Sequence, residues 1–139
     1  MDANAPILCV EDDPLDVENL RRSFALVGIA NPLVTARNGQ EALDLLRTEA
    51  GTGLLLPGLI LLDLGMPIMG GLELLEALKS DARLRGIPVV VLSAANRDVE
   101  RRQAYQLGAA GYVVKPIGFE AFATAVERIA RYWALCEPL

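Results

Sequence analysis

Short apolar runs recur along the chain, and stretches with helical spacing separate them. The clearest runs cover residues 7–10, 59–62, 89–92 and 112–114, and a weaker run covers residues 32–36. Unbroken apolarity, rather than alternation, is typical of strands that are buried on both faces of a sheet. The runs therefore predict five strands of a parallel sheet that is covered by helices.

Between the runs, apolar side chains recur at three- and four-residue intervals and predict helices. The clearest stripes lie at positions 17, 20, 24 and 27, at positions 72, 75 and 78, and at positions 119, 122, 126, 129 and 133. Asp13 before Pro14 predicts an N-cap with proline at the first helical position, and Asn38 with Glu41 predicts a capping box. The segment 96–107 carries few apolar residues, so we expect it to be the weakest helix.

The order of the elements predicts one α/β domain over residues 1–139, with its core in residues 6–131 and a C-terminal extension at 132–139. Five strand–helix units form a doubly wound five-stranded parallel sheet when the crossovers are right-handed. In such sheets ligands bind beyond the carboxyl ends of the strands. Residues 49–57 are predicted to be a loop whose leucines either pack over a helix end or line a contact.

Composition narrows the function classes. The chain of 139 residues is 53% hydrophobic, carries a net charge of −5 and has no histidine and two cysteines. Zinc sites and histidine-based nucleophilic triads are therefore disfavoured, and dispersed basic residues disfavour nucleic-acid binding. The sequence also predicts no secretory signal and no membrane span, so a reducing cytoplasm is the expected location.

Charged residues follow three of the predicted strands. Glu11 and Asp12 follow the first strand, Asp63 follows the third, and Lys115 ends the fifth. Carboxylates without histidine or clustered thiolates suit a hard cation such as Mg²⁺. We expect Asp12 and Asp63 to bind Mg²⁺ directly, with the Gly65 carbonyl as a third ligand and Glu11 acting through water.

Asp63 is also the predicted nucleophile. A carboxylate beside Mg²⁺ can attack a phosphoryl group and form an acyl phosphate. The added negative charge calls for donors, and Ser93 at the end of the fourth strand and Lys115 at the end of the fifth offer them. Taken singly, Ser93 reads equally well as a strand-end cap and Lys115 as a surface lysine. Their joint placement at one edge of the sheet favours a shared site.

Four motifs together resemble one known family. They are ILCVEDD at residues 7–13, LLDLGMP at 61–67, VLSAA at 91–95 and LGAAGYVVKP at 107–116. Over residues 6–131 the chain resembles the receiver domain of two-component response regulators. The resemblance implies a flavodoxin-like fold with strand order 2-1-3-4-5. It also implies Mg²⁺-dependent phosphorylation of Asp63 by the phosphohistidine of a sensor histidine kinase, with no turnover of a separate substrate.

The resemblance further implies a switch pair. Ser93 would move to the phosphoryl group and Tyr112 would swing into the vacated space, although an aromatic side chain that simply packs on the fifth strand is the simpler alternative for Tyr112. The family usually has a cis peptide bond before Pro116. The chain departs from the family pattern at Gly70, where many members carry aspartate. Gly65 and Ala95 offer no side chain that could position or block a hydrolytic water.

The C-terminal segment resembles receivers that partner bacterial phytochromes, which indicates a bacteriophytochrome as the kinase. Tyr132 and Trp133, on a last helix that is expected to protrude, suggest a homodimer or partner surface on the fourth helix, the fifth strand, the fifth helix and the tail. Alternatively, Trp133 simply continues the apolar stripe of its helix.

Three other functions fit parts of the sequence. A flavodoxin-like flavin carrier shares the architecture but needs a phosphate loop where this chain has Glu11-Asp12-Asp13. A Mg²⁺-dependent aspartyl phosphatase usually has a second aspartate where this chain has Gly65. A receiver-like scaffold without phosphorylation would have no need of the acids and of Lys115.

Overall fold

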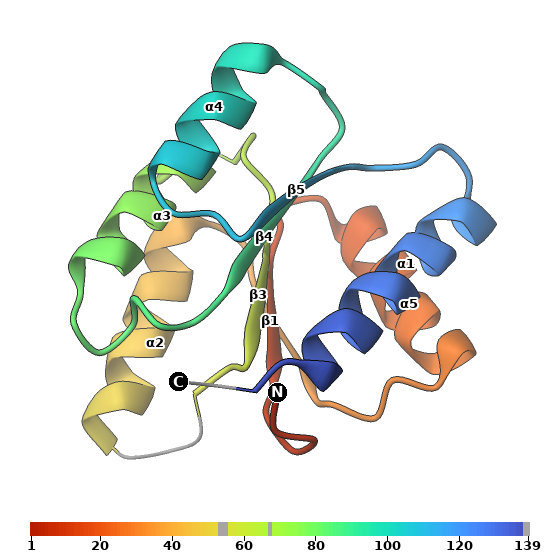
Figure 1. Ribbon diagram of the computed structural model, residues 1–139, viewed down its shortest axis with the longest axis horizontal. Coiled ribbons are helices and arrows are strands. Elements are labelled where there is room, and N and C mark those ends of the chain that lie inside the picture. The colour runs from red at the N-terminus through yellow and green to blue at the C-terminus, as the bar shows by residue number, and fades with distance from the viewer. Residues whose placement is uncertain (53–55, 67, 138–139) are drawn as a thin grey trace.

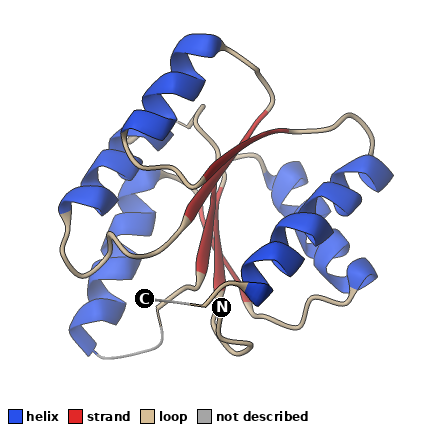
Figure 2. Ribbon diagram, in the orientation of Figure 1, coloured by secondary structure: helices blue, strands red, loops and turns tan. Residues whose placement is uncertain are grey.

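A five-stranded parallel sheet runs through the centre of the molecule, with helices on both faces (Figures 1 and 2). The computed structural model describes residues 1–52, 56–66 and 68–137. The strands are β1 (Ile7–Val10), β2 (Leu33–Ala36), β3 (Leu59–Leu62), β4 (Val89–Ser93) and β5 (Gly111–Val114). Their order is β2-β1-β3-β4-β5, which confirms the predicted doubly wound fold.

The helices form two layers. They are α1 (Pro14–Val27), α2 (Gly39–Thr52), α3 (Gly71–Ser80), α4 (Asp98–Gln106) and α5 (Phe119–Leu135). Figure 1 shows α1 and α5 on one face of the sheet and α2, α3 and α4 on the other. Within the described part of the chain, no helix is both long and apolar enough to cross a membrane.

Most of the expected element boundaries agree with the structure to within two residues, but the expected loop at 49–57 begins too early. The helix α2 continues to Thr52, residues 53–55 lie outside the described residues, and Leu56 packs against the core. For Leu56 the structure therefore favours packing within the protein, and not a role in a contact surface.

The core consists of two apolar clusters, one on each face of the sheet. Alternate residues of β1 enter opposite clusters, with Leu8 and Val10 on the α2–α3 side and Ile7 and Cys9 on the α1–α5 side. The strands β1, β3 and β4 are buried along their whole length because each has a neighbour on both sides. This burial explains their unbroken apolar sequences.

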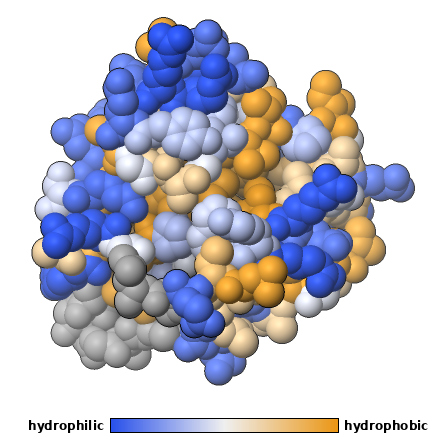
Figure 3. Space-filling view, viewed as in Figure 1, coloured by the Kyte–Doolittle hydropathy of each residue, from blue (hydrophilic) through white to orange (hydrophobic). Residues whose placement is uncertain are grey.

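The edge helix α4 is held weakly. Ala104 is its one buried residue, whereas α3 buries Gly71, Leu74, Leu75 and Leu78. Figure 3 shows a largely hydrophilic surface over α4 on the side in view. Few buried contacts make α4 the helix whose position costs least to change, as the sequence predicted.

Local hydrogen bonds set the two helix starts that the sequence marked. The N–H of Leu15 donates to Asp13 Oδ1 at 2.9 Å, with Pro14 in the first turn, which confirms the N-cap of α1. The N–H of Glu41 donates to Asn38 Oδ1 at 2.9 Å. The Glu41 carboxylate lies 3.4 Å from Arg37 Nε. Of the expected capping box, the bond from the Glu41 N–H to Asn38 therefore forms and, within the described residues, the return bond from the Asn38 N–H to the Glu41 carboxylate does not.

Replacement of Asp13 separates its role as a cap from a role as a metal ligand. We expect Asp13→Ala to lower the free energy of unfolding by about 1 kcal/mol, because one N–H at the start of α1 loses its acceptor. Asp13→Asn keeps an acceptor and stays close to the wild type. Urea unfolding measures both changes. An Asp13→Ala protein of unchanged stability that no longer binds a divalent cation would contradict the cap.

Candidate functional site

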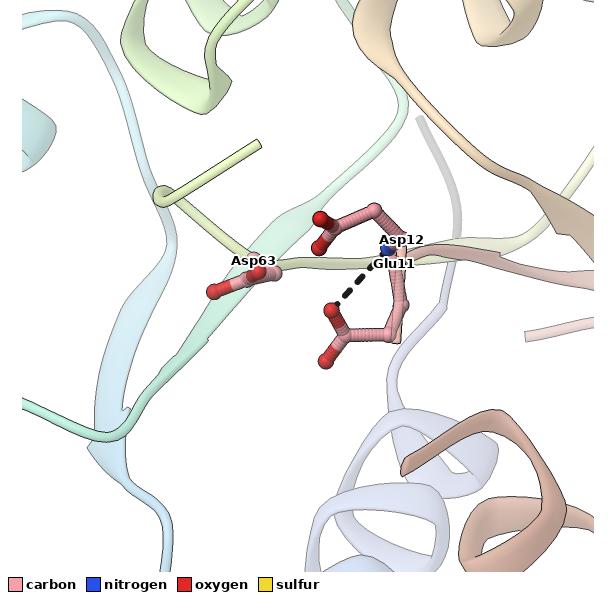
Figure 4. A group of neighbouring side chains, drawn as sticks. All are labelled: Glu11, Asp12 and Asp63. Atoms are coloured by element: carbon pink, nitrogen blue, oxygen red, sulfur yellow. Dashed lines mark hydrogen bonds between the residues drawn. The ribbon is translucent and has the colours of Figure 1, made fainter. Parts of the chain in front are cut away.

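Three carboxylates meet where two neighbouring strands end. Val10 of β1 lies opposite Leu62 of β3, and the Asp63 N–H donates to the Val10 carbonyl at 3.0 Å. This register brings Glu11 and Asp12 beside Asp63, with one oxygen of each within 4.8 Å of the other two. Figure 4 shows Glu11 and Asp12 projecting from the end of β1 on the side that faces Asp63.

The three acids differ in exposure. Glu11 is buried, with 5% of its surface exposed, Asp63 is half-buried and Asp12 is exposed. The Asp12 N–H donates to Glu11 Oε2 at 3.0 Å. Burial raises the pKa of Glu11 to about 8, and Asp63 adds to the rise while Lys115 opposes it. The cluster therefore holds its negative charge at a cost, which a cation would relieve.

Lys115 lies beside this cluster. Its N–H donates to the Ser93 carbonyl at 2.7 Å. Its Nζ donates to Glu11 Oε1 at 2.6 Å and to Asp16 Oδ2 at 3.0 Å. Burial alone would lower the pKa of Lys115, but the hydrogen bonds to the two carboxylates outweigh burial and raise it. The ammonium is thus held charged at the rim of the sheet.

The structure therefore places Lys115 near the acids, as expected, but on acceptors other than Asp63. A direct interaction of Lys115 with a phosphoryl group on Asp63 stays a prediction. Sequence analysis missed Asp16. Its sole signal is an acid in the first turn of a helix, where acids are common because they suit the helix dipole.

The expected switch residues share one attachment point in the loop between β4 and α4. Ser93 is buried, and its Oγ accepts from the Ala95 N–H at 3.2 Å. The half-buried Tyr112 donates from its hydroxyl to the Ala95 carbonyl at 2.8 Å. On the far side, Tyr105 Oη of α4 accepts from the Tyr112 N–H at 3.1 Å. The exchange of Ser93 and Tyr112 stays a prediction.

The loops after β3 and β5 complete the rim. The Gly65 N–H lies 3.4 Å from Asp63 Oδ1, and a Cβ at Gly65 would meet nothing within 4 Å. A role for its carbonyl as a metal ligand stays a prediction. No cis peptide bond occurs within the described ranges, so the expected cis bond before Pro116 is wrong.

The donor set indicates what the site can hold. Its ligand atoms are carboxylate oxygens, one of them on an exposed side chain, and the chain has no histidine. Oxygen-only sites with room for water suit hard divalent cations and disfavour zinc. The residues therefore fit a cation of the Mg²⁺ type.

Comparisons with known proteins agree with this geometry. A family model described as the response regulator receiver domain matches residues 7–127. A probable methanogenesis regulatory protein, FilR2 from Methanothrix harundinacea, is 40% identical over 127 residues. The match covers 91% of this chain and 82% of the relative.

Solved structures extend the similarity to phytochrome signalling. The phosphorylated cyanobacterial phytochrome response regulator RcpA is 33% identical, with a TM-score of 0.87 and 95% of each chain covered. The Mn²⁺-bound form of the response regulator Rcp1 is 29% identical, with a TM-score of 0.85, and the match covers 97% of this chain and 98% of that chain.

Removal of the Lys115 ammonium tests how far it offsets the acidic cluster. In metal-free buffer at about pH 8.5 we expect Lys115→Met to lower the free energy of unfolding by about 1–3 kcal/mol, because Glu11 loses its partner. Without that partner the pKa of Glu11 in the folded state rises further above its unfolded value. The variant therefore loses stability as the pH rises and is less affected at about pH 6.

The exposed pair of Arg131 and Glu127, 3.0 Å apart with 69% of the arginine side chain exposed, supplies the matched control. We expect Arg131→Met to cost less than about 0.5 kcal/mol at either pH. Urea unfolding of both variants at both pH values measures these costs. Equal small losses for the two variants would show that Lys115 does not offset the cluster.

Proposed function

The chain belongs to the receiver-domain family of response regulators, the signalling proteins of two-component systems, and we propose that it accepts a phosphoryl group on Asp63. The donor is the phosphohistidine of a sensor histidine kinase, and the reaction requires Mg²⁺. The protein catalyses its own phosphorylation and dephosphorylation and turns over no separate substrate. The observation that carries the proposal is the meeting of Glu11, Asp12 and Asp63 within 4.8 Å.

The position of Asp63 in the sheet supports its role as the acceptor. The strand β3 lies between β1, which supplies the other acids, and β4, which supplies Ser93. Glu11 is already engaged by Lys115 and by the Asp12 N–H. In the transfer an Asp63 oxygen bonds to phosphorus while the bond between phosphorus and the kinase imidazole breaks. The electron pair of that bond stays on the imidazole nitrogen.

The metal proposal rests on the donor chemistry. Asp12 and Asp63 bind the cation directly, with the Gly65 carbonyl as a third ligand, and Glu11 acts through water. Bound Mg²⁺ supplies neutralisation of the charge on the transferring oxygens. The similarity to Rcp1, solved in a Mn²⁺-bound form, supports a divalent cation at this cluster.

Exposed apolar side chains around the site support a protein as the phosphoryl donor. Leu15, Ile68 and Ile117 follow β1, β3 and β5 at the same end of the sheet, and Ile117 is 99% exposed. A small phosphoryl donor is too small to cover these side chains, whereas a kinase domain can bury them on binding. The similarity to RcpA, a phytochrome response regulator, supports a bacteriophytochrome as the source of the signal.

We further propose that the signal leaves through protein contacts, including a homodimer through α4, β5, α5 and the tail. Val99, Tyr105 and Tyr132 are exposed on these elements. Trp133 is half-buried and packs against the second core cluster, so the structure favours the core alternative for this side chain. A cytoplasmic location remains a prediction from the sequence.

Treatment with a small acyl phosphate and Mg²⁺ tests the acceptor. We expect the wild type to gain the mass of one phosphoryl group and Asp63→Asn to gain none, because an amide oxygen is too weak a nucleophile. Asp44→Asn removes an exposed carboxylate of α2 and should leave the gain intact. Intact-protein mass spectrometry measures all three. An equal gain in Asp63→Asn would move the acceptor elsewhere.

The raised pKa of Glu11 predicts pH-dependent Mg²⁺ binding. As the pH falls through about 8, Glu11 gains a proton that competes with the cation. We expect the affinity for Mg²⁺ to fall by up to about tenfold per pH unit below this pKa. In Glu11→Gln, binding is weaker at high pH but changes little with pH. Isothermal titration calorimetry at several pH values measures the slope, and an unchanged slope in the variant would contradict the assignment to Glu11.

A further inference from the structure

Asp16 is a charged neighbour of the site to which the proposed function gives no role. It lies in the first turn of α1, and 37% of its side chain is exposed. Its Oδ2 accepts from Lys115 Nζ at 3.0 Å, and 15% of the lysine side chain is exposed. Among the described residues the lysine ammonium donates to Glu11 and Asp16, and no hydrogen bond joins it to Asp63.

A phosphoryl group on Asp63 changes the competition for this ammonium. Phosphorylation adds about 1.5 to 2 negative charges near neutral pH, together with strong acceptor oxygens. Of the two carboxylates that hold Lys115, Glu11 belongs to the candidate metal cluster and Asp16 does not. The contact with Asp16 therefore lies outside the candidate metal cluster, and a phosphoryl group on Asp63 would have to compete with it for the ammonium.

The space around the pair allows such a movement. A pocket of about 380 Å³ adjoins the lysine and is lined by Asp16, Asn19, Lys115 and Phe122, among others. Once released, the Asp16 carboxylate can be hydrated there, so its separation from Lys115 leaves no buried charge without a partner.

We propose that Asp16 is a positioning residue that holds Lys115 away from Asp63 in the unphosphorylated protein. Asp16 thereby lowers the affinity of the site for a phosphoryl group. This inference rests on the proposed function and adds to it a residue that sets the balance between the two states. Half-exposed ion pairs of this kind change an equilibrium by about two- to fivefold.

Beryllofluoride, a phosphoryl analogue that binds to an aspartate carboxylate, measures this balance at saturating Mg²⁺. We expect Asp16→Asn to bind it about two- to fivefold more tightly than the wild type, because Lys115 then keeps only Glu11 as a charged partner and turns towards Asp63 at a lower cost. Asp16→Glu keeps the negative charge and should bind like the wild type. Titration followed by ¹H–¹⁵N NMR gives each dissociation constant and shows that each variant is folded.

Two controls separate positioning from a general gain in positive charge. Glu18→Gln makes the same change of charge at an exposed position of α1, and its affinity should match that of the wild type. In a Lys115→Met background, Asp16→Asn should give no further gain, because the residue acts through the lysine. A purely structural role for Asp16 would not make its effect on affinity depend on Lys115 in this double-mutant cycle.

The outcomes distinguish the two proposals. Equal affinity in the wild type and Asp16→Asn, or the same gain in Glu18→Gln, overturns the inference about Asp16 alone. A gain that persists without Lys115 also overturns it. Absence of beryllofluoride binding by the wild type overturns the proposed function and this inference together.

Discussion

The register of β1 against β3 is the constraint on which the site depends. Because Val10 lies opposite Leu62, the residues that follow both strands must emerge side by side, and here they are acids. Like charges so close together repel, and the burial of Glu11 adds a desolvation cost that raises its pKa. The sheet itself thus maintains a concentration of negative charge that side chains alone would not assemble.

The apolar core makes this arrangement possible. The three central strands are buried on both faces, and their packing far from the rim supplies the free energy against which the charge repulsion is set. The part of the structure that can move most easily when the charge changes lies away from the core, at α4 and the loop before it. The helix α4 buries one residue. In the loop before it, the Ala95 N–H donates to Ser93 Oγ and the Ala95 carbonyl accepts from the Tyr112 hydroxyl. Rigid strands hold the acids, and a weakly packed edge is free to move.

The sequence was sufficient for the fold because the fold depends on periodicity. Unbroken apolar runs place strands, and the acid or lysine after each run places the rim. The same reasoning could not find the contact between Asp16 and Lys115. Glu11, Asp16 and Asp63 lie near one lysine, and which of them accepts a hydrogen bond from the ammonium depends on side-chain directions at the scale of one rotamer. The trans bond before Pro116 shows that a resemblance to a family can also mislead, because the cis bond that is usual in the family does not occur here.

Lys115 links the acidic cluster to α1 because its one ammonium donates to both Glu11 and Asp16. In the structure it forms ion pairs with Glu11 at 2.6 Å and Asp16 at 3.0 Å and so offsets their negative charge. A divalent cation at the acidic cluster would neutralise part of the negative charge that Lys115 now offsets at Glu11. Under the proposed function, linkage means that whatever weakens the bonds of Lys115 to Glu11 and Asp16 also favours a phosphoryl group on Asp63. Under the same proposal, the repulsion among the acids would couple the binding of the metal ion to that of the phosphoryl group.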